Sequence, residues 1–228
     1  MKTREYVTSY VKSIDRKFQH GSLEVYEWIF LNSVCSGLDH FPACQNILEI
    51  GSYNYCSSSS FLEAMQNIPE MCETKFTSVD PVHQGWRFPD KKVDSRWEKI
   101  EQPSQEYLPT IVEEEEFDLI FIDGWHKPPI IFEDGRNARR LIRDNGLVVF
   151  HDTNCIKMRN QIATLSEEVS EYNDVVYFDL SRRRNGKFQG SNAGGFALWS
   201  ASATTFEDVV KVGNQLNERC CEYRGVEK

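Results

Sequence analysis

The sequence predicts an α/β fold in which a mostly parallel sheet is covered by helices. Two apolar runs, Leu119–Ile122 and Leu147–Phe150, are too short for helices and are typical of buried strands. The segment between them carries apolar residues that fit one helical face: Ile131, Phe132, Ala138, Leu141 and Ile142. A strand, a helix and a second strand form a crossover unit, and this crossover requires the two strands to be parallel.

Acidic and imidazole side chains follow both of these predicted strands. Asp123 and His126 come after the first strand, and His151 and Asp152 come after the second. Parallel strands end at the same edge of a sheet, which is where open α/β sheets bind their ligands. We therefore expect the two carboxylates and the two imidazoles to converge there as a candidate active site.

An upstream strand and turn form the second informative segment. Asn46–Ile50 predicts a buried strand, and a turn containing Gly51 leads from it into a serine-rich helix start. Such a turn places backbone N–H groups and serine hydroxyls against the polar atoms of a ligand. Phe76–Val79 predicts another strand, and Asp80 at its end stands where an acidic residue can bind both ribose hydroxyls. An ordinary turn with a capping serine is the alternative, because the GxGxxG fingerprint is absent.

A helix is expected before this unit. Ser22 offers an N-cap, and the residues after it have the apolar spacing of one helical face: Leu23, Tyr26, Phe30, Val34 and Leu38. We expect residues 1–45 to form a helical cap over the sheet or a substrate entrance. Residues 46–228 are then a single α/β domain.

Shorter patterns predict the remaining elements. Trp97–Ile100 reads as a strand, and helices are predicted at Gln105–Val112, Cys155–Tyr172 and Phe206–Cys220. The β-rich runs Val175–Leu180 and Gly195–Trp199 are separated by a segment with the hairpin-type dipeptide Asn185–Gly186. An antiparallel pair of strands is expected there.

Composition narrows the class of protein. The chain is 40% hydrophobic and 27% charged, which is ordinary for a globular protein, and its net charge of −9 disfavours a general nucleic-acid or membrane binder. Seven cysteines without a CxxC pair indicate reduced thiols. No signal-peptide core and no apolar run of about 18 residues is present. We expect a soluble, cytoplasmic protein with a small-molecule substrate, and self-association into a homo-oligomer stays open.

Four motifs in order resemble those of class I S-adenosylmethionine-dependent methyltransferases. They read ILEIGSYNYCSSSSFL, FTSVDP, FDLIFIDGWH and LVVFHDTN, and together they span about Ile47 to Asn154. The resemblance is closest to the small-molecule O-methyltransferase branch, whose members read EIGxxxGxSS, an acidic strand end, IDGxH and HD. It implies a Rossmann-like fold: a mostly parallel seven-stranded sheet with a reversed last strand and helices on both faces.

The resemblance also implies a role for individual residues in binding the methyl donor. The methionine portion would be lined by Glu49, Gly51, Ser52 and Ser57, and Asp80 would hold the ribose. Gln102 or Ser104 would lie near the adenine, and Asp123 would lie beside the bound donor. Apart from the resemblance, the position of Trp125 next to the predicted site suggests that it stacks on adenine or substrate, and packing on a helix is the alternative.

Methyl transfer is an in-line displacement on a sulfonium, so the protein must align the partners and expose an oxyanion. In metal-dependent members the carboxylates at Asp123 and Asp152 hold Mg²⁺, which lowers the pKa of the substrate hydroxyl. We expect Asp123 to be catalytic and His126 or His151 to take the proton. For His126 the alternative is a cap on the following helix or a hydrogen bond to a backbone carbonyl. Whether this chain needs a metal stays open.

Two departures from the family pattern bear on these roles. Tyr55 stands where the family has a glycine, and a left-handed backbone would cost a bulky residue about 1–2 kcal/mol. Asn54 could adopt that conformation instead, with Tyr55 turned outward. His151 precedes Asp152 where many metal-dependent relatives have a second acidic residue, and histidine suits Mg²⁺ poorly.

The sequence thus predicts a methyltransferase that moves a methyl group from S-adenosylmethionine to a hydroxyl of a small molecule. One alternative is a degenerate methyltransferase fold that binds a ligand without turnover. Another is a metal-dependent hydrolase, which leaves Glu49, Gly51 and Asp80 unexplained. Specificity is expected from the N-terminal helix, the His83–Asp94 loop and the Arg182–Gly194 hairpin.

Overall fold

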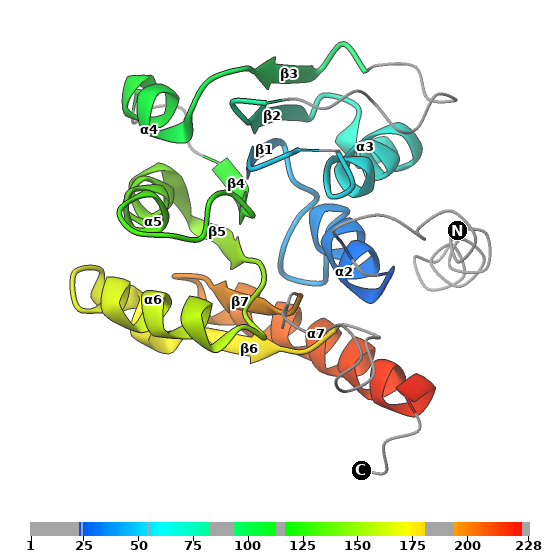
Figure 1. Cartoon of the computed structure of the whole chain (residues 1–228). Helices are drawn as coiled ribbons and strands as arrows, with labels where there is room; N and C mark the ends of the chain where they lie inside the picture. Colours follow the sequence, from blue (N-terminus) through cyan, green and yellow to red (C-terminus); the bar gives the residue numbers. More distant parts are fainter. Residues whose placement is uncertain are drawn as a thin grey trace.

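A computed structural model describes residues 23, 25–53, 55–82, 94–112, 117–180 and 194–224. A seven-stranded sheet runs through this part of the chain, with helices on both of its faces (Figure 1). The strands are β1 (Asn46–Ile50), β2 (Lys75–Val79), β3 (Trp97–Ile100), β4 (Phe117–Ile122), β5 (Ile142–Phe150), β6 (Val176–Phe178) and β7 (Phe196–Trp199). The α-helices are α2 (Val25–Cys35), α3 (Ser58–Asn67), α4 (Ser104–Tyr107), α5 (Ile130–Leu141), α6 (Ile156–Ser166) and α7 (Ala203–Arg224).

The strand order is β3-β2-β1-β4-β5-β7-β6. β7 pairs antiparallel with both β5 and β6, and every other neighbouring pair is parallel. The predicted fold, a mostly parallel seven-stranded sheet with a reversed last strand, is therefore confirmed. The order reverses between β1 and β4, and such a switch point is where open α/β sheets form their ligand crevice.

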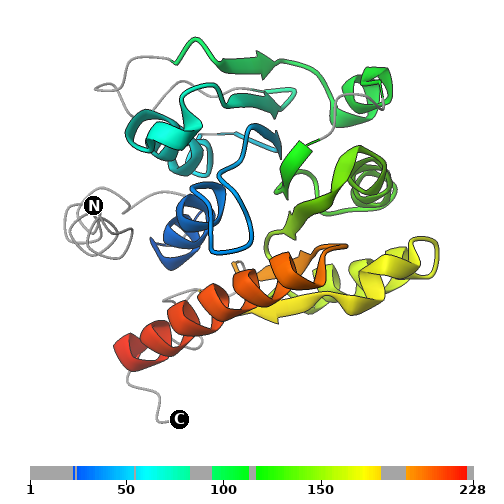
Figure 2. The ribbon, with the colours of Figure 1, turned by 180° about the vertical axis from the view of Figure 1, so that it is seen from behind.

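Alternating residues of the central strands divide the core into two layers. Ile47 of β1 and Phe121 of β4 pack with residues of α2, α3 and α7 on one face. Leu48 and Ile120, their neighbours along the same strands, pack with residues of α5 and α6 on the other. The view from behind shows α7 running along the β6 and β7 end of the sheet (Figure 2). Both faces are covered, as expected from strands that are apolar throughout.

The first described helix, α2, differs from its sequence prediction. An amphipathic helix with one apolar face was expected, yet the side chains from Glu27 to Cys35 are all buried. The reason is its position between α3 and α7, both of which it contacts. Its polar residues find partners there: Trp28 donates to the Ser59 hydroxyl at 2.9 Å, and Asn32 donates to the Ser60 carbonyl at 2.9 Å.

Three smaller predictions need correction. Ile142 was expected on the α5 face, but α5 ends at Leu141 and Ile142 begins β5, because its backbone is extended. The helix expected at Gln105–Val112 is a single α-turn, α4, followed by a 3₁₀ helix at Leu108–Thr110. The predicted helix Cys155–Tyr172 is α6 followed by a 3₁₀ helix at Ser170–Asp174.

Several predicted segments lie outside the described residues. They are the first 20 residues, the loop at His83–Asp94 except Asp94, the acidic run at Glu113–Glu116, and the hairpin tip at Arg182–Gly194 except Gly194. Among the helices that are described, none is long and apolar enough to cross a membrane.

Candidate active site

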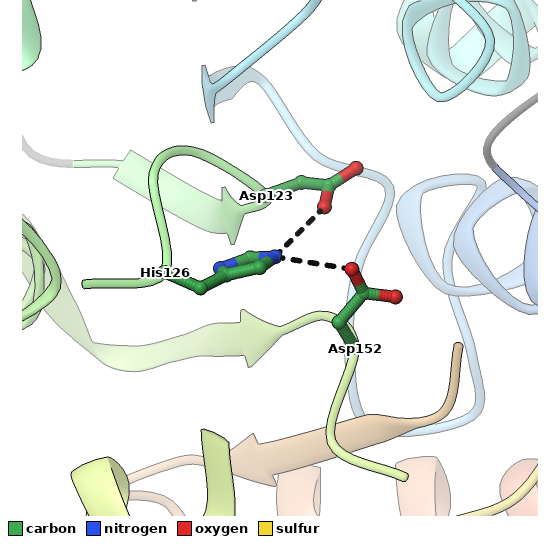
Figure 3. Close-up of side chains that lie close together, drawn as sticks. All are labelled: Asp123, His126 and Asp152. Atoms are coloured by element: carbon green, nitrogen blue, oxygen red, sulfur yellow. Dashed lines mark hydrogen bonds and ion pairs between the residues drawn. The ribbon is translucent and has the colours of Figure 1, made fainter. Parts of the chain in front are cut away.

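Two carboxylates and a histidine meet at the C-terminal edge of the sheet, as the sequence predicted. Asp123 follows β4 and Asp152 follows β5, and the ring of His126 lies between them (Figure 3). The Nε2 atom of His126 is 3.2 Å from Oδ2 of Asp152 and 3.6 Å from Oδ1 of Asp123. One ligand atom from each of the three residues lies within 4.8 Å of the others. This geometry can hold a cation.

The sheet register explains why the two carboxylates are close. Ile122 at the end of β4 pairs with Phe150 at the end of β5, so Asp123 and Asp152 follow paired residues. Asp152 has a φ of 59°, a left-handed conformation that is uncommon for residues other than glycine, and such conformations cluster at active sites. Its Oδ1 accepts the N–H of Gly194 at 2.5 Å, which fixes the carboxylate.

The electrostatics of these residues favour positive charge between the carboxylates. Burial opposes protonation of His126, but its hydrogen bonds to Asp123 and Asp152 raise its pKa to about 9. Burial also opposes ionisation of Asp152, yet the hydrogen bond from His126 and the charge of His151 hold its pKa well below the usual range. The pKa of Asp123 is likewise lowered, against burial, by His151 and His126. A proton on His126 or a metal ion between the two aspartates would each supply the positive charge that balances their carboxylates.

His151 occupies a different position from His126. Its side chain is 1% exposed and lies behind the carboxylates, with Nδ1 2.8 Å from Oδ1 of Asp123. Its Nε2 is 3.4 Å from Oε2 of Glu27 on α2. The ring is therefore held between two carboxylates in the interior, whereas the side chain of His126 is 26% exposed.

Glu49, in β1, is fully buried and connects the strand to the start of α3. Its Oε1 accepts the hydroxyl of Ser57 and its Oε2 accepts the hydroxyl of Ser58, each at 2.5 Å. Burial raises the pKa of Glu49 to about 8, even though both serine hydrogen bonds lower it. A buried carboxyl of this kind attracts a ligand cation, because a cation restores its ionised form.

Gly51 brings the first loop against the loop after β4. Its φ is 90°, and a Cβ built at this position would lie 2.3 Å from the carbonyl oxygen of Asp123. Its N–H donates to Val79 of β2, and the N–H of Asp123 donates to Ile50. Only glycine permits this backbone conformation at this distance. The first loop and the acidic pair are therefore parts of one site.

The prediction that Tyr55 turns outward is wrong. Tyr55 itself adopts the left-handed conformation, with a φ of 63°, and its side chain is only 4% exposed. Its ring packs edge-on against Trp97 of β3 with centroids 5.1 Å apart, and the Lys99 ammonium lies 5.2 Å from its centroid. These contacts offset a backbone cost of about 1–2 kcal/mol. Asn54 lies outside the described residues.

Asp80 follows β2 and braces the loops on either side of it. Its Oδ2 accepts the N–H of Tyr53 at 2.9 Å and its Oδ1 accepts the N–H of Val82 at 2.8 Å. Each carboxylate oxygen has two acceptor positions, so these backbone contacts leave room for a ligand's hydroxyl groups.

The other predicted ligand residues surround the same edge with different exposure. Ser52 and Ser104 are buried, and Gln102 is exposed. Ser104 accepts a hydrogen bond from Gln105 at 2.7 Å at the start of α4. Trp125 is 60% exposed, with the Lys127 ammonium 4.8 Å from its ring centroid. The indole therefore has a free face for stacking and is not packed into the core.

Residues 48–153 match the model of a protein family described as methyltransferase domain. The matched segment is therefore similar to a methyltransferase domain. The match begins within β1 and ends just after Asp152, so it contains the acidic pair, His126, Glu49 and Asp80. The sequence resemblance to class I methyltransferases is confirmed. No curated protein sequence matches the chain.

Solved structures share the fold of this methyltransferase. SAH-bound PaMTH1 from Podospora anserina has 14% identity, covers 88% of each chain and gives a TM-score of 0.50. The O-methyltransferase TomG from Streptomyces achromogenes, solved with SAM, has 18% identity, covers 86% of this chain and 90% of that chain, and gives 0.51. Spermidine synthase from Thermotoga maritima has 11% identity, covers 88% and 75%, and gives 0.56. At these identities the likeness establishes the fold.

Sequence reasoning missed two polar residues at this methyltransferase site. Ser58 was read only as part of a helix start, although it hydrogen-bonds Glu49 just as Ser57 does. Glu27 was read as an ordinary residue of an amphipathic helix, although it reaches His151. The available signal was an acidic residue directly before the apolar run Trp28–Leu31. Glu27 also lies outside the residues that match the family model.

Proposed function

We propose that this methyltransferase transfers the methyl group of S-adenosylmethionine to a hydroxyl group of a small molecule. One observation carries the proposal: Gly51 joins the first loop to the backbone of Asp123. The loop residues proposed to bind the methyl donor and the residues proposed for acid–base chemistry therefore lie at one edge of the sheet. TomG, which has the same fold, is an O-methyltransferase solved with SAM.

The donor residues are assigned from position and chemistry. Glu49, buried and with a raised pKa, suits the ammonium of the methionine portion, with Ser52 and Ser57 beside it. Asp80 at the end of β2 suits the ribose hydroxyls. Ser104 and the exposed Trp125 suit the adenine, one as a polar contact and the other as a stacking face.

The residues between the strand ends fit a divalent cation. Asp123 and Asp152 supply hard oxygen ligands, and one carboxylate oxygen of each lies within 4.8 Å of the other. We propose Mg²⁺ held by Asp123 and Asp152 as the physiological ion. When bound, such an ion lowers the pKa of a coordinated hydroxyl and orients it.

In the proposed reaction the acceptor oxygen forms a bond to the methyl carbon as the bond from carbon to sulfur breaks. The electron pair of that bond goes to sulfur, so the sulfonium becomes a neutral thioether, S-adenosylhomocysteine. The acceptor hydroxyl loses its proton to Nε2 of His126, which can accept it only in the neutral form. The two aspartates raise the pKa of His126 to about 9, so a cation held by their carboxylates would lower it and favour the neutral form. Alignment of the two reactants supplies the rest of the rate enhancement.

A reducing, cytoplasmic location is also proposed. All five cysteines whose side chains are described are free: Cys35, Cys44, Cys56, Cys72 and Cys155. Free cysteines are the rule in reducing compartments.

Calorimetry with S-adenosylmethionine and S-adenosylhomocysteine, followed by turnover assays on a panel of phenols, catechols and sugar alcohols, tests the proposal. Each assay is run with Mg²⁺ and with EDTA. We expect both nucleosides to bind and at least one hydroxyl acceptor to be methylated. No binding at millimolar concentration would refute a methyl-donor site. Binding with no acceptor turned over would favour a ligand-binding protein, and turnover unaffected by EDTA would remove the metal.

A further inference from the structure

Helix α2 carries a buried carboxylate that points toward the active site. Glu27 is 0% exposed and is flanked in the chain by the buried apolar residues Trp28 and Ile29. An acidic group in such surroundings is costly unless its oxygens have partners. Both oxygens have one: Oε1 accepts the N–H of Gly195 at 2.5 Å, and Oε2 lies 3.4 Å from Nε2 of His151.

Each partner of Glu27 leads to one of the two catalytic-site aspartates. His151 contacts Glu27 through Nε2 and Asp123 through Nδ1, at 2.8 Å from Oδ1. Gly195 follows Gly194, whose N–H donates to Oδ1 of Asp152. Both glycines have positive φ. The turn into β7 therefore presents two successive N–H groups, that of Gly194 to the Asp152 carboxylate and that of Gly195 to the Glu27 carboxylate. One side chain on α2 therefore supports both aspartates, Asp123 through His151 and Asp152 through the Gly194–Gly195 turn.

The alternative is that Glu27 only satisfies backbone groups at the end of β7. The contact to His151 argues against this, since a carboxylate that served Gly195 alone would have no need of an imidazole. A histidine ring held at both nitrogens has a fixed orientation, and partners behind an active-site group commonly fix it in this way.

We propose that Glu27 is a positioning residue, which fixes the His151 ring and the Gly194–Gly195 turn and thereby orients Asp123 and Asp152. The inference builds on the proposed function, because it concerns the same acidic pair. It also assigns a catalytic contribution to α2, which lies outside the residues that match the family model. Glu27 itself contacts no substrate.

The test compares Glu27→Ala, Glu27→Gln and the matched control Asn32→Ala. Glutamine keeps an oxygen for the Gly195 N–H and can donate its amide to Nε2 of His151, whereas alanine removes both contacts. Asn32 lies on the same helix, is buried, and bonds the Ser60 carbonyl away from the acidic pair. Crystal structures, thermal melting, S-adenosylhomocysteine affinity and kcat are measured for all three.

Glu27→Ala should rotate the His151 ring away from Asp123 and lower kcat by about 10–100-fold, with KM for the methyl donor unchanged. Glu27→Gln should restore the ring position and most of kcat. Asn32→Ala should lose thermal stability comparably while keeping the ring position and kcat. A His151 ring that stays in place in Glu27→Ala would overturn the proposal, and so would an equal loss of kcat in Asn32→Ala.

The ring position separates this inference from the proposed function. If the wild-type protein binds no methyl donor but the ring moves in Glu27→Ala alone, the positioning role stands and the methyltransferase proposal fails. If the wild-type protein binds the donor and turns it over, but the His151 ring and kcat are unaffected in Glu27→Ala, the methyltransferase proposal stands and the positioning role fails.

Discussion

The Nε2 atom of His126 lies 3.2 Å from Oδ2 of Asp152, although 26 residues separate them in the chain. The parallel register of β4 and β5 produces this approach, since Ile122 pairs with Phe150 immediately before the two loops diverge. The site therefore depends on strand pairing in the core as well as on its own side chains. Substitutions at the site can be chosen to separate chemistry from donor binding.

Asp152→Asn should lower kcat by about 100-fold or more, the scale of lost acid–base or metal assistance. Asparagine tolerates the left-handed backbone of this position and can still accept the Gly194 N–H. Affinity for S-adenosylhomocysteine should therefore be unchanged in calorimetry. Asp174→Asn, at an exposed position, is the control for general effects. Full activity of Asp152→Asn would remove this carboxylate from the reaction.

Asp80→Ala should weaken binding of the methyl donor and leave turnover intact, the reverse of what is expected for Asp152→Asn. Loss of the proposed hydrogen bonds to ribose is expected to weaken S-adenosylhomocysteine binding by about 1.5–3 kcal/mol, the scale for hydrogen bonds to a charged group. The variant also loses the acceptor for the Tyr53 N–H, so a lower melting temperature should accompany the change. Turnover at saturating donor should persist. Unchanged affinity would show that Asp80 braces the loop without touching the ligand.

Local sequence patterns were sufficient to predict the central sheet and the acidic pair. Asp123 and Asp152 could be placed together because parallel strands end at one edge, which requires no knowledge of side-chain packing. The same logic placed Asp80 at the end of β2 and Gly51 in the first turn. The ends of the predicted strands were therefore enough to locate most residues of the candidate site from the sequence.

What the sequence could not predict are the contacts made between distant elements. Tyr55 turned inward because Trp97 and Lys99 of β3 provide a place for its ring, more than 40 residues away in the chain. Glu27 reached His151 across 124 residues because α2 is enclosed by α3 and α7. Helical periodicity reports one buried face, and it cannot report that the opposite face is buried as well.

Glu49 should make stability depend on pH. Burial raises its pKa to about 8, whereas the unfolded chain releases this proton near the ordinary value of 4.5. Between these values the folded state binds more protons than the unfolded state, so the free energy of unfolding falls as pH rises from about 4.5 to 8. Above and below that window this group contributes no slope.

Urea unfolding of the wild type and Glu49→Gln at pH 5 and pH 8 checks this dependence. Glutamine keeps an acceptor and a donor for Ser57 and Ser58 but cannot ionise, so the variant should lose less stability between the two pH values. The scale is about 1.4 kcal/mol for each unit of pKa shift. Glu70→Gln, at an exposed glutamate, should follow the wild type. Parallel curves for the wild type and Glu49→Gln would mean that Glu49 is ionised in the folded protein.

Gly51→Ala should disrupt both stability and donor binding. The φ of 90° is unfavourable for alanine, and the added Cβ would lie 2.3 Å from the Asp123 carbonyl oxygen and 2.6 Å from the Gly124 nitrogen. Both neighbours are backbone atoms of the loop directly after β4, so they cannot rotate away as a side chain would. The left-handed backbone alone costs about 1–2 kcal/mol, and the overlap adds to it. We expect a clear drop in melting temperature and loss of S-adenosylhomocysteine binding.

Gly124→Ala is the matched control, because it adds the same atom to the facing loop. A Cβ at Gly124 would meet Oδ2 of Asp134 and the Ile50 side chain at 3.4 Å, and no backbone atom nearer than 3.7 Å. Its stability should therefore change by less than about 1 kcal/mol, as expected for a substitution without strain or overlap. If the two variants melt alike, the close approach of the loops is not what makes Gly51 necessary. A large effect at Gly51 alone would establish that the donor loop and the acidic pair are built on one backbone contact.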